Sequence, residues 1–257
     1  SWIVATANDI GTRAEQQDRV SVLRSRRTGG HLVIMADGMG GHADGAAAAQ
    51  QVVDVAGMAF RNRAIDSPRT FLEEVCQEAH SRIRESAKGN GRPPGSTCTL
   101  LYLQDEEAYW MHVGDSRLYH FSEEGLRSRT QDHTLTELMT ADGATAGEDG
   151  APASNQLYMC LGGENAVVPN FGASALGRDD WFMLCTDGFW SQVRLHEVAR
   201  LMGVHGSLDE VAKQLVALAR RRASGNCDNI TLALVRRDSG RGWWPLRRSR
   251  SHRPGTP

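Results

Sequence analysis

Five aspartates of this sequence each stand beside a run of apolar residues. Asp37 follows LVIMA and Asp187 follows WFMLCT, and a glycine comes directly after each of them. Asp115 follows MHVG, whereas Asp18 and Asp228 precede the runs RVSV and NITLALV. If these runs are strands of packed sheets, the five carboxylates can meet at one rim, where each would raise the pKa of the others. Bound Mg²⁺ or Mn²⁺ would relieve the repulsion, because hard divalent ions prefer oxygen ligands.

The alternative for each of these sites is an ordinary turn, because Asp and Gly are common turn residues. Taken singly, each fits a turn better than a metal ligand. Five carboxylates at strand boundaries, each next to an apolar run, favour a metal centre instead. The glycines at 38, 40 and 41 would let the backbone approach an ion or an anion closely.

The composition is that of an ordinary globular protein and limits the possible partners. The chain has 257 residues, of which 40% are hydrophobic and 23% charged, and its formal net charge is −2. That length suits one large domain or two small ones, and the charge gives no reason to expect nucleic acid. Neither a membrane-spanning run nor a signal peptide is apparent, so we expect a cytoplasmic protein. The five cysteines are scattered and lack CxxC spacing, which predicts reduced thiols.

Short apolar runs and helical periodicities predict the elements that would position these aspartates. One helix is expected over residues 45–63, and another after Ser67, with Pro68 at its first position. Capping boxes, in which Ser or Thr is followed three residues later by Glu, predict helices after Ser207 and Thr134. The predicted strands cover residues 1–7, 19–25, 31–36, 96–104, 108–114, 116–121, 181–186 and 230–237.

Seven motifs, in chain order, resemble those of the metal-dependent type 2C protein serine/threonine phosphatases in their bacterial form. They are GTRAEQQD, VIMADGMGGH, GSTCT, HVGDSR, QDHT, LCTDG and CDNIT. The resemblance spans residues 5–235 and implies an α+β fold: a four-layer α/β/β/α sandwich with two central antiparallel sheets flanked by helices. It also implies two Mn²⁺ or Mg²⁺ ions at one end of the sandwich, and a third, weaker ion.

The resemblance implies a metal-binding role for five matching positions. Asp37 would bridge both ions, and the carbonyl of Gly38 would bind one of them. Asp187 and Asp228 would bind the other ion. Asp115, together with Asp187, would hold the third ion.

Three further positions would support the metal centre. Asp18 would hold a metal-bound water, and Asn229 would position Asp228. Arg13 stands where the family has the arginine that binds substrate phosphate, a task that suits a planar guanidinium. The catalytic set implied by the resemblance is therefore Arg13, Asp18 and Asp37.

Two departures from the family pattern affect this reading. Gln16 stands where the family usually has Asn, which puts the packing near Asp18 in question. Met39 stands where animal members have a histidine as the proposed general acid, as it does in bacterial relatives. The nearest histidine, His42, could transfer a proton or contact substrate, although a structural histidine at a helix entry is the more usual case.

Other polar residues of the motifs are expected to be structural. His133 should bind backbone near residues 140–156, a small, polar, Gly-rich stretch that predicts a surface loop or flap helping to select substrate. Ser96 and Ser116 are not candidate nucleophiles, because neither lies in a GxSxG elbow or has a base paired with it in sequence.

The expected reaction is direct hydrolysis of phosphoserine or phosphothreonine. Two ions about 3.5–4 Å apart would lower the pKa of a bridging water toward neutrality. The resulting hydroxide would attack phosphorus in line with the departing Ser or Thr oxygen, without a phosphoenzyme. Metal-bound water would protonate the leaving oxygen.

The catalytic domain is assigned to residues 1–237, and residues 238–257 to an Arg-rich flexible tail or linker. Trp243 and Trp244 are the only features that favour the alternative, contact of this tail with a membrane or another anionic surface, and we do not expect it. We expect a monomer that acts in signal transduction on phosphorylated Ser/Thr proteins, including a cognate kinase or its substrates. Two alternatives are a catalytically inactive phosphatase-fold binding module and an enzyme narrowed to one phosphorylated regulator.

Overall fold

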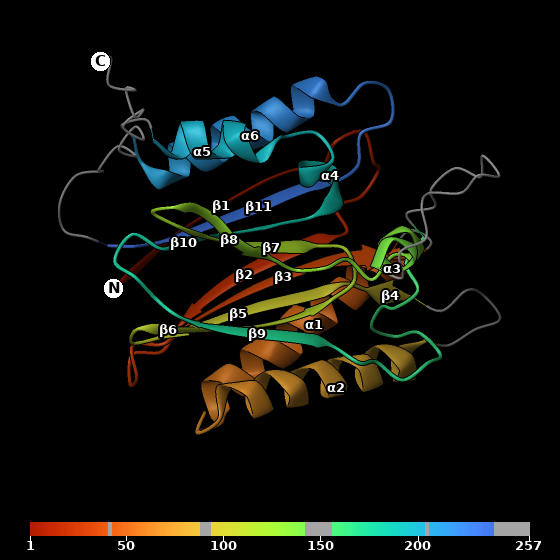
Figure 1. Ribbon diagram of the computed structural model, residues 1–257. Coiled ribbons are helices and arrows are strands. Elements are labelled where there is room, and N and C mark those ends of the chain that lie inside the picture. The colour runs from red at the N-terminus through yellow and green to blue at the C-terminus, as the bar shows by residue number, and fades with distance from the viewer. Residues whose placement is uncertain (41–42, 88–93, 142–155, 204–205, 239–257) are drawn as a thin grey trace, which may run out of the picture.

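Two antiparallel sheets pack face to face, and helices cover both outer faces, as the computed structural model in Figure 1 shows. The structure describes residues 1–40, 43–87, 94–141, 156–203 and 206–238. The predicted four-layer α/β/β/α sandwich is therefore confirmed. Most of the predicted loop at 140–156, the predicted tail beyond Asp238, and His42 lie outside the described residues.

Each sheet is assembled from strands that are distant in sequence. In the first sheet the strand order is β1 (Trp2–Asp9), β11 (Ile230–Arg237), β10 (Trp181–Cys185), β7 (Arg117–Ser122) and β8 (Gly125–Arg129). In the second sheet the order is β2 (Asp18–Arg24), β3 (His31–Met39), β5 (Cys98–Gln104), β6 (Glu107–Val113) and β9 (Asn170–Ala175), with the short β4 (Gly95–Ser96) paired to β3. Loops at one end of both sheets thus bring together parts of the chain that are far apart in sequence.

The helices form the two outer layers. The second sheet is covered by α1 (Ala43–Asn62) and α2 (Pro68–Ser86), and the first by α4 (Asp187–Trp190), α5 (Leu195–Met202) and α6 (Leu208–Arg222). A further helix, α3 (Leu135–Ala141), lies at the end of the sandwich that also holds β4. No helix within the described residues has both the length and the apolar character needed to cross a membrane.

The predicted helix caps are present. The Ser67 hydroxyl accepts the Thr70 N–H ahead of α2, at 3.4 Å, and Pro68 occupies the first turn. Ser207 and Glu210 form the reciprocal box of α6: the Ser207 hydroxyl accepts the Glu210 N–H at 3.2 Å, and Glu210 accepts the Ser207 N–H at 3.0 Å. The Thr134 hydroxyl accepts the Glu137 N–H at 3.3 Å at the start of α3. These side chains satisfy N–H groups that the first helical turn leaves unpaired.

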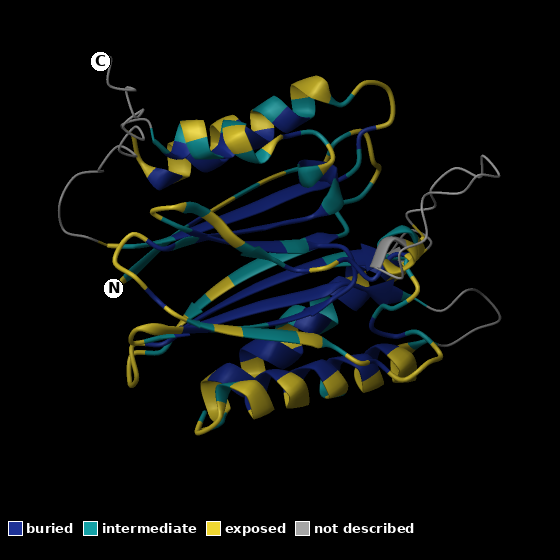
Figure 2. Cartoon of the chain, viewed as in Figure 1, coloured by how far each residue is buried: buried dark blue, intermediate teal, exposed yellow. Residues whose placement is uncertain are grey.

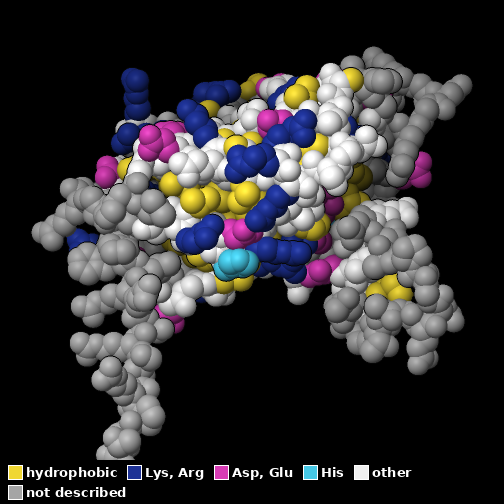
Figure 3. All heavy atoms as spheres, turned by 90° about the horizontal axis from the view of Figure 1, so that it is seen from above, with side chains coloured by type: hydrophobic (Ala, Val, Ile, Leu, Met, Phe, Trp, Pro, Cys, Tyr) yellow, Lys and Arg dark blue, Asp and Glu magenta, His cyan; other side chains and the backbone are white. Residues whose placement is uncertain are grey.

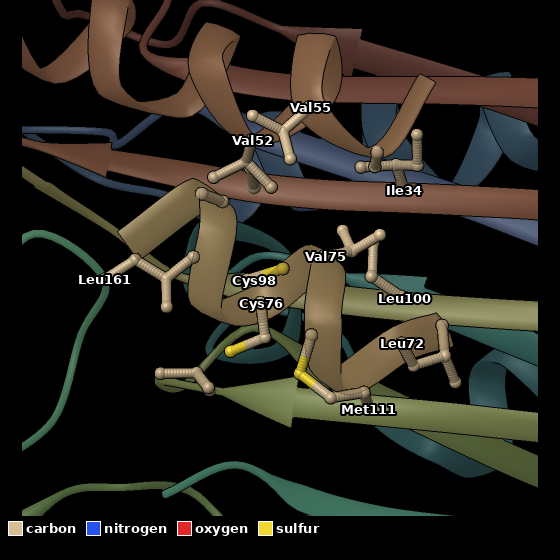
Figure 4. Close-up of a cluster of buried hydrophobic side chains, with 14 of the residues drawn as sticks. Ile34, Val52, Val55, Leu72, Val75, Cys76, Cys98, Leu100, Met111 and Leu161 are labelled. Carbon is tan, nitrogen blue, oxygen red and sulfur yellow. The ribbon is translucent and has the colours of Figure 1, made fainter. Parts of the chain in front are cut away.

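The core has three parts, and β3 contributes to two of them. Val33 and Met35 lie in the core between the two sheets, whereas Leu32 and Ile34 lie under α1 and α2. Figure 4 shows Ile34 and its neighbours packed against side chains of these two helices. Because both faces of the strand are covered, its sequence is continuously apolar rather than alternating. Figure 2 shows the result: buried strands inside, exposed helix faces outside.

Several elements differ from the predicted ones. Asp37 was expected to follow its strand, and this prediction was wrong: β3 continues to Met39, and Asp37 pairs with Asp18 within the ladder. The strand is extended because its last residues pair with β4, a two-residue strand formed by the first residues of the GSTCT motif. Strands β8 and β9 and helices α4 and α5 were not predicted. Strand β9 reads NFGASA, whose small residues have weak strand propensity.

The outer face over α5 and α6 carries many basic side chains (Figure 3). Two of these arginines are paired with acids: Arg220 with Asp9, at 3.5 Å, and Arg222 with Glu197, at 2.6 Å.

All five cysteines are free thiols in the structure.

Candidate active site

The five predicted carboxylates come together at the end of the sandwich where β4 and α4 lie (Figure 1). Asp18 and Asp37 are register partners on β2 and β3, in the second sheet. Asp187 begins α4 directly after β10, Asp228 lies just before β11, and Asp115 lies between β6 and β7. Removal from water, and then the charges of the other four carboxylates, raise the pKa of Asp37 well above its usual value. The predicted convergence of these five residues is thus present.

The backbone of Asp37 is held by the GSTCT motif. Its N–H donates to the Thr97 hydroxyl at 2.9 Å, and its carbonyl accepts the Thr97 N–H at 2.9 Å and the Ser96 hydroxyl at 3.2 Å. The Thr97 hydroxyl also shares a 2.7 Å hydrogen bond with Ser116. Ser96 and Ser116, which were not expected to be nucleophiles, are fully buried and hydrogen-bonded.

The Asp18 carboxylate is bonded through one oxygen only. Its Oδ2 accepts the hydroxyls of Thr186, at 2.9 Å, and Thr231, at 2.7 Å. Its Oδ1 is buried and has no hydrogen-bond partner among the described residues. Burial, opposed by these two hydrogen bonds and reinforced by the charges of Asp187 and Asp228, raises the pKa of Asp18 to about 7. A buried acceptor without a donor is rare and calls for an explanation.

Asp187, like Asp18, has a buried oxygen without a partner among the described residues and a raised pKa, and the pKa of Asp115 is raised as well. That oxygen of Asp187 is Oδ1. Burial, followed by the charge of Asp228, raises the pKa of Asp187 to about 6. Burial and then the charges of Asp187 and Asp132 raise the pKa of Asp115 to about 7. Unpartnered oxygens among mutually repelling carboxylates fit a bound cation, and an all-oxygen set fits a hard one.

Asp228 differs from the other four because it has a countercharge. Its Oδ2 lies 2.7 Å from a guanidinium nitrogen of Arg13, and the two side chains are 41% and 58% exposed, respectively. The other oxygen, Oδ1, accepts the N–H of Asn229 at 2.8 Å. Arg13, the predicted phosphate-binding residue, is therefore at the rim of the carboxylate cluster.

Asn229 ties this rim to the loop that carries Arg13. Its side-chain amide donates to the carbonyls of Ile10, at 2.8 Å, and Glu15, at 3.1 Å, and accepts the Gln17 N–H at 2.8 Å. The amide thus meets three backbone groups of the loop that carries Arg13, and the role implied for Asn229 in positioning Asp228 stays a prediction.

The substitution of Gln16 for the usual Asn is accommodated by the backbone. Oε1 of Gln16 accepts the N–H of Asp18 at 3.0 Å, and its Nε2 donates to the carbonyl of Asp9 at 3.3 Å. The longer side chain therefore spans from β1 to β2 and leaves the Asp18 carboxylate in the cluster.

Two glycines permit the close backbone approach that the cluster needs. A Cβ on Gly38 would lie 2.0 Å from the carbonyl oxygen of Gly45, at the start of α1. A Cβ on Gly188 would lie 2.1 Å from the carbonyl oxygen of Asn229. Larger residues at either position would push the α1 start or the Asp228 segment away from the site.

Sequence reasoning missed a network beside Asp115. Arg117 forms a bidentate ion pair with the buried Asp132, at 2.9 and 2.7 Å, and its guanidinium lies 3.5 Å from the ring centre of Trp190. The Trp190 indole N–H donates to the Asp115 carbonyl at 2.9 Å. Arg117 and Asp132 belong to the HVGDSR and QDHT motifs, but nothing in their spacing indicates that Trp190 joins them.

His133 bonds backbone groups, as expected, but its ring Nδ1 and its backbone N–H both bond Gly114 rather than groups near residues 140–156. The ring Nδ1 of His133 accepts the Gly114 N–H at 3.2 Å, and the backbone N–H of His133 donates to the Gly114 carbonyl at 2.8 Å. These bonds fix the turn that carries Asp115.

Within the described part of the chain, no three Asp, Glu, His or Cys side chains are placed to hold an ion by themselves. Magnesium sites in proteins generally use one or two carboxylates and keep several waters. A metal ion here would therefore draw its remaining ligands from water or from backbone carbonyls. The all-oxygen donor set fits Mg²⁺ or Mn²⁺, because Oδ1 of Asp18 and Oδ1 of Asp187 are buried without a partner among the described residues.

Comparison with known proteins gives consistent results. The protein phosphatase 2C family model matches residues 8–223. Protein phosphatase PhpP of Streptococcus pneumoniae is 31% identical, over 90% of this chain and 96% of that protein. The serine/threonine phosphatase of S. agalactiae has a TM-score of 0.83 at 26% identity, covering 92% of this chain and 99% of that one. The catalytic domain of the phosphatase PstP, in complex with two manganese ions, has a TM-score of 0.77 at 25% identity, with coverages of 91% and 97%. The chain therefore belongs to the protein phosphatase 2C family, as its motifs predicted.

Proposed function

We propose that this chain is a metal-dependent protein serine/threonine phosphatase that uses the carboxylate cluster to hydrolyse phosphoserine and phosphothreonine. The observation that carries the proposal is the pair of buried, unpartnered oxygens on Asp18 and Asp187, within a cluster that also includes Asp37. Such an arrangement is unfavourable without a cation and becomes favourable with one. The similarity to PhpP and to the manganese-bound PstP domain supports the same conclusion.

In this proposal, Asp37, the Gly38 carbonyl, Asp187 and Asp228 hold two Mn²⁺ or Mg²⁺ ions. Asp115 and Asp187 would hold a third. When bound, these ions supply Lewis acidity that activates water and neutralises charge on phosphate oxygens. The roles of the individual residues are those implied by the motifs, and the hydrogen bonds of each side chain support them.

Asp18 holds a water at its free oxygen. Because Oδ2 is already bonded to two hydroxyls, only Oδ1 is available to accept from that water. A carboxylate fixed in this way keeps the water in one orientation, which is the main requirement for in-line attack on phosphorus.

Arg13 binds the substrate phosphate. Its guanidinium is more than half exposed, and a planar fork matches two phosphate oxygens. In the structure it pairs with Asp228, a contact that competes with metal binding at the same carboxylate. If Asp228 held an ion, its carboxylate would be neutralised and the Arg13 guanidinium would be free to turn toward phosphate.

The proposed setting follows the sequence-based expectations. The substrates would be phosphorylated Ser/Thr proteins, including a cognate kinase or its substrates, in a cytoplasmic signalling pathway. The catalytic domain would span residues 1–237, with 238–257 as an Arg-rich tail, and the protein would act as a monomer. Size-exclusion chromatography with light scattering tests the last point.

The decisive experiment measures phosphate release from p-nitrophenyl phosphate and from a phosphothreonine peptide with Mn²⁺ and with EDTA. We expect turnover with Mn²⁺, none with EDTA, and none in Asp37→Asn with Mn²⁺. If wild-type protein binds Mn²⁺ by calorimetry but releases no phosphate from either substrate or from phosphorylated proteins, the chain is a binding module and the proposal is wrong.

A further inference from the structure

We infer that Thr186 and Thr231 are positioning residues that clamp the Asp18 carboxylate and so set the affinity of the site for its ions. This inference rests on the proposed function, because it deepens the role of Asp18 in that site. Neither threonine would touch substrate or metal. Both act through the carboxylate, and we call the pair the threonine clamp.

Both hydroxyls of the threonine clamp bind the same carboxylate oxygen. Thr231 Oγ1 lies 2.7 Å and Thr186 Oγ1 lies 2.9 Å from Oδ2 of Asp18. Both threonines are at most 1% exposed, and Asp18 is 4% exposed. Two donors on one oxygen fix the plane of the carboxylate. The other oxygen, Oδ1, is buried and has no partner within the described residues, so it is left as a free acceptor there.

The direction of the Thr186 hydroxyl is set by the backbone. The N–H of Thr231 donates to Thr186 Oγ1 at 3.1 Å, so this oxygen already accepts a hydrogen bond. A carboxylate oxygen has no proton to give when ionised, so the Thr186 O–H must point at Asp18. The two threonines are also joined by a 3.1 Å bond from the Thr186 N–H to the Thr231 carbonyl.

The threonine clamp also connects the two sheets. Asp18 begins β2 in the second sheet, whereas Thr186 follows β10 and Thr231 lies in β11, both in the first. Asp37, the register partner of Asp18, is on the second sheet, and Asp187 follows Thr186 on the first. The clamp therefore holds the two halves of the carboxylate cluster at a set separation.

The alternative is that these are ordinary buried hydrogen bonds that contribute to stability alone. The two cases differ in one measurable respect. A clamp that orients a carboxylate for an ion changes metal affinity, whereas a purely structural bond changes only the thermal midpoint. Removing outer partners of a metal site typically costs 10- to 100-fold in affinity or activity.

Thr231→Val tests the inference most cleanly, because it removes one donor and keeps the side-chain shape. Thr186→Val would in addition leave the Thr231 N–H without its acceptor. Thr231→Ser keeps the donor and serves as the rescue variant. Thr130→Val is the control for loss of a buried threonine hydroxyl away from Asp18: Thr130 is 6% exposed, lies just after β8, and its hydroxyl accepts the Leu118 N–H at 3.0 Å, a bond that Thr186→Val would lose in the same way.

The measurements are Mn²⁺ affinity by calorimetry, the thermal midpoint, and kcat and KM for a phosphothreonine peptide at saturating Mn²⁺. For Thr231→Val we expect Mn²⁺ affinity to fall on the order of 10- to 100-fold, with KM for the peptide nearly unchanged. Thr231→Ser should bind Mn²⁺ within a few-fold of wild type. Thr130→Val should lose thermal stability while keeping wild-type affinity.

Wild-type Mn²⁺ affinity in folded Thr231→Val would overturn the inference, and it would leave the proposed function intact. If wild-type protein binds Mn²⁺ without turnover, the proposed function fails, while the affinity of Thr231→Val still decides the threonine clamp. If no Mn²⁺ binds to wild-type protein, both are wrong. Should Thr231→Val not fold, Thr231→Ala removes the same hydroxyl without adding a methyl group beside the carboxylate.

Discussion

Two sides of the candidate site hold their carboxylates in opposite ways. The inner pair, Asp18 and Asp37, is removed from water and held by hydroxyls and backbone groups that carry no charge. The rim pair, Arg13 and Asp228, is substantially exposed and joined by a 2.7 Å ion pair. The inner pair therefore needs a cation from solution, whereas in the rim pair the Arg13 guanidinium is already the countercharge of Asp228.

This difference indicates that the two pairs have different functions. Exposed ion pairs contribute only about 0.2–1 kcal/mol, so the rim pair can open when an ion or phosphate competes for one partner. Within the described residues the two inner carboxylates have no such exchange available, because the charges that shift their pKa values are those of other carboxylates. We therefore expect changes in the inner pair to act on metal binding and turnover, and changes in the rim pair to act on substrate binding.

The largest effect is expected from the inner pair. Asp37→Asn should reduce Mn²⁺-dependent turnover on the order of 10³-fold or more, because several kcal/mol of charge stabilisation correspond to that factor. Asp187→Asn should have a similar effect. Phosphate release from p-nitrophenyl phosphate at saturating Mn²⁺ provides the measurement.

Thermal melts of Asp37→Asn in EDTA give the control. The variant should be at least as stable as wild type, because the amide no longer repels four carboxylates. Near-wild-type turnover in Asp37→Asn would remove the distinction between the inner pair and the rim pair.

A smaller effect, on KM, is expected from the rim pair. Arg13→Ala should raise KM for a phosphothreonine peptide about 10- to 100-fold, which corresponds to the 1.5–3 kcal/mol of hydrogen bonds to charged groups. Its Mn²⁺ affinity should be unchanged or tighter, because Asp228 is released from its ion pair. Steady-state kinetics and calorimetry on the same preparation measure both quantities.

Arg82→Ala is the matched control for Arg13→Ala. Arg82 is 47% exposed and pairs with Glu78 at 2.9 Å on α2, in the outer helical layer. This variant should leave KM and Mn²⁺ affinity unchanged. Weakened Mn²⁺ affinity in Arg13→Ala would show that the rim pair supports metal binding rather than competing with it.

The stabilisation by Mn²⁺ should depend on pH. The pKa values of Asp18 and Asp115, about 7, and of Asp187, about 6, lie above the ordinary value of 3.8. Between about pH 4 and 7 the folded apoprotein therefore holds protons that the unfolded chain has released, and its stability falls as pH rises. Metal binding displaces these protons, so the gain in melting temperature with Mn²⁺ over EDTA should be larger at about pH 7.5 than at pH 5.

Subtracting the melting temperature in EDTA from that in Mn²⁺ at each pH removes the contribution of His112, whose pH dependence has the opposite sign. Burial lowers the pKa of His112 to about 3, so this group makes the protein more stable as pH rises toward 6.5, with or without metal. Melts by circular dichroism at both pH values provide the test. A gain with Mn²⁺ that is the same at both pH values would contradict the raised pKa values of the cluster.

The smallest effect is expected from Gln16→Asn, which introduces the residue that the family usually carries. The shorter side chain cannot keep both the Asp18 N–H and the Asp9 carbonyl, so unfolding free energy should fall by about 1 kcal/mol. Turnover should stay within a few-fold of wild type, because the carboxylate itself is unchanged. Denaturant unfolding measures the loss, and a large loss of turnover would show that Gln16 has a more direct role.

Much of the site follows from short motifs in the sequence. Asp37, Asp187 and Asp228 can be identified because each lies in a motif that includes the glycine or asparagine supporting it. The caps at Ser67 and Ser207 are visible for the same reason, since a cap and its partner lie three residues apart. Helix α5 lacks such a signal, because the residue at its N-cap is Arg194 rather than Ser, Thr, Asp or Asn. Glu197 nevertheless accepts the Arg194 N–H at 3.0 Å.

The sequence by itself determined which residues are acidic beside apolar runs, and hence the chemistry that they can support. Only the tertiary structure decided which of them has a countercharge and which oxygen remains free. The Arg13–Asp228 pair spans 215 residues, and the Thr231–Asp18 bond spans 213. Contacts of this kind arise from the alignment of two sheets, and that alignment depends on the packing of the whole core rather than on any local pattern.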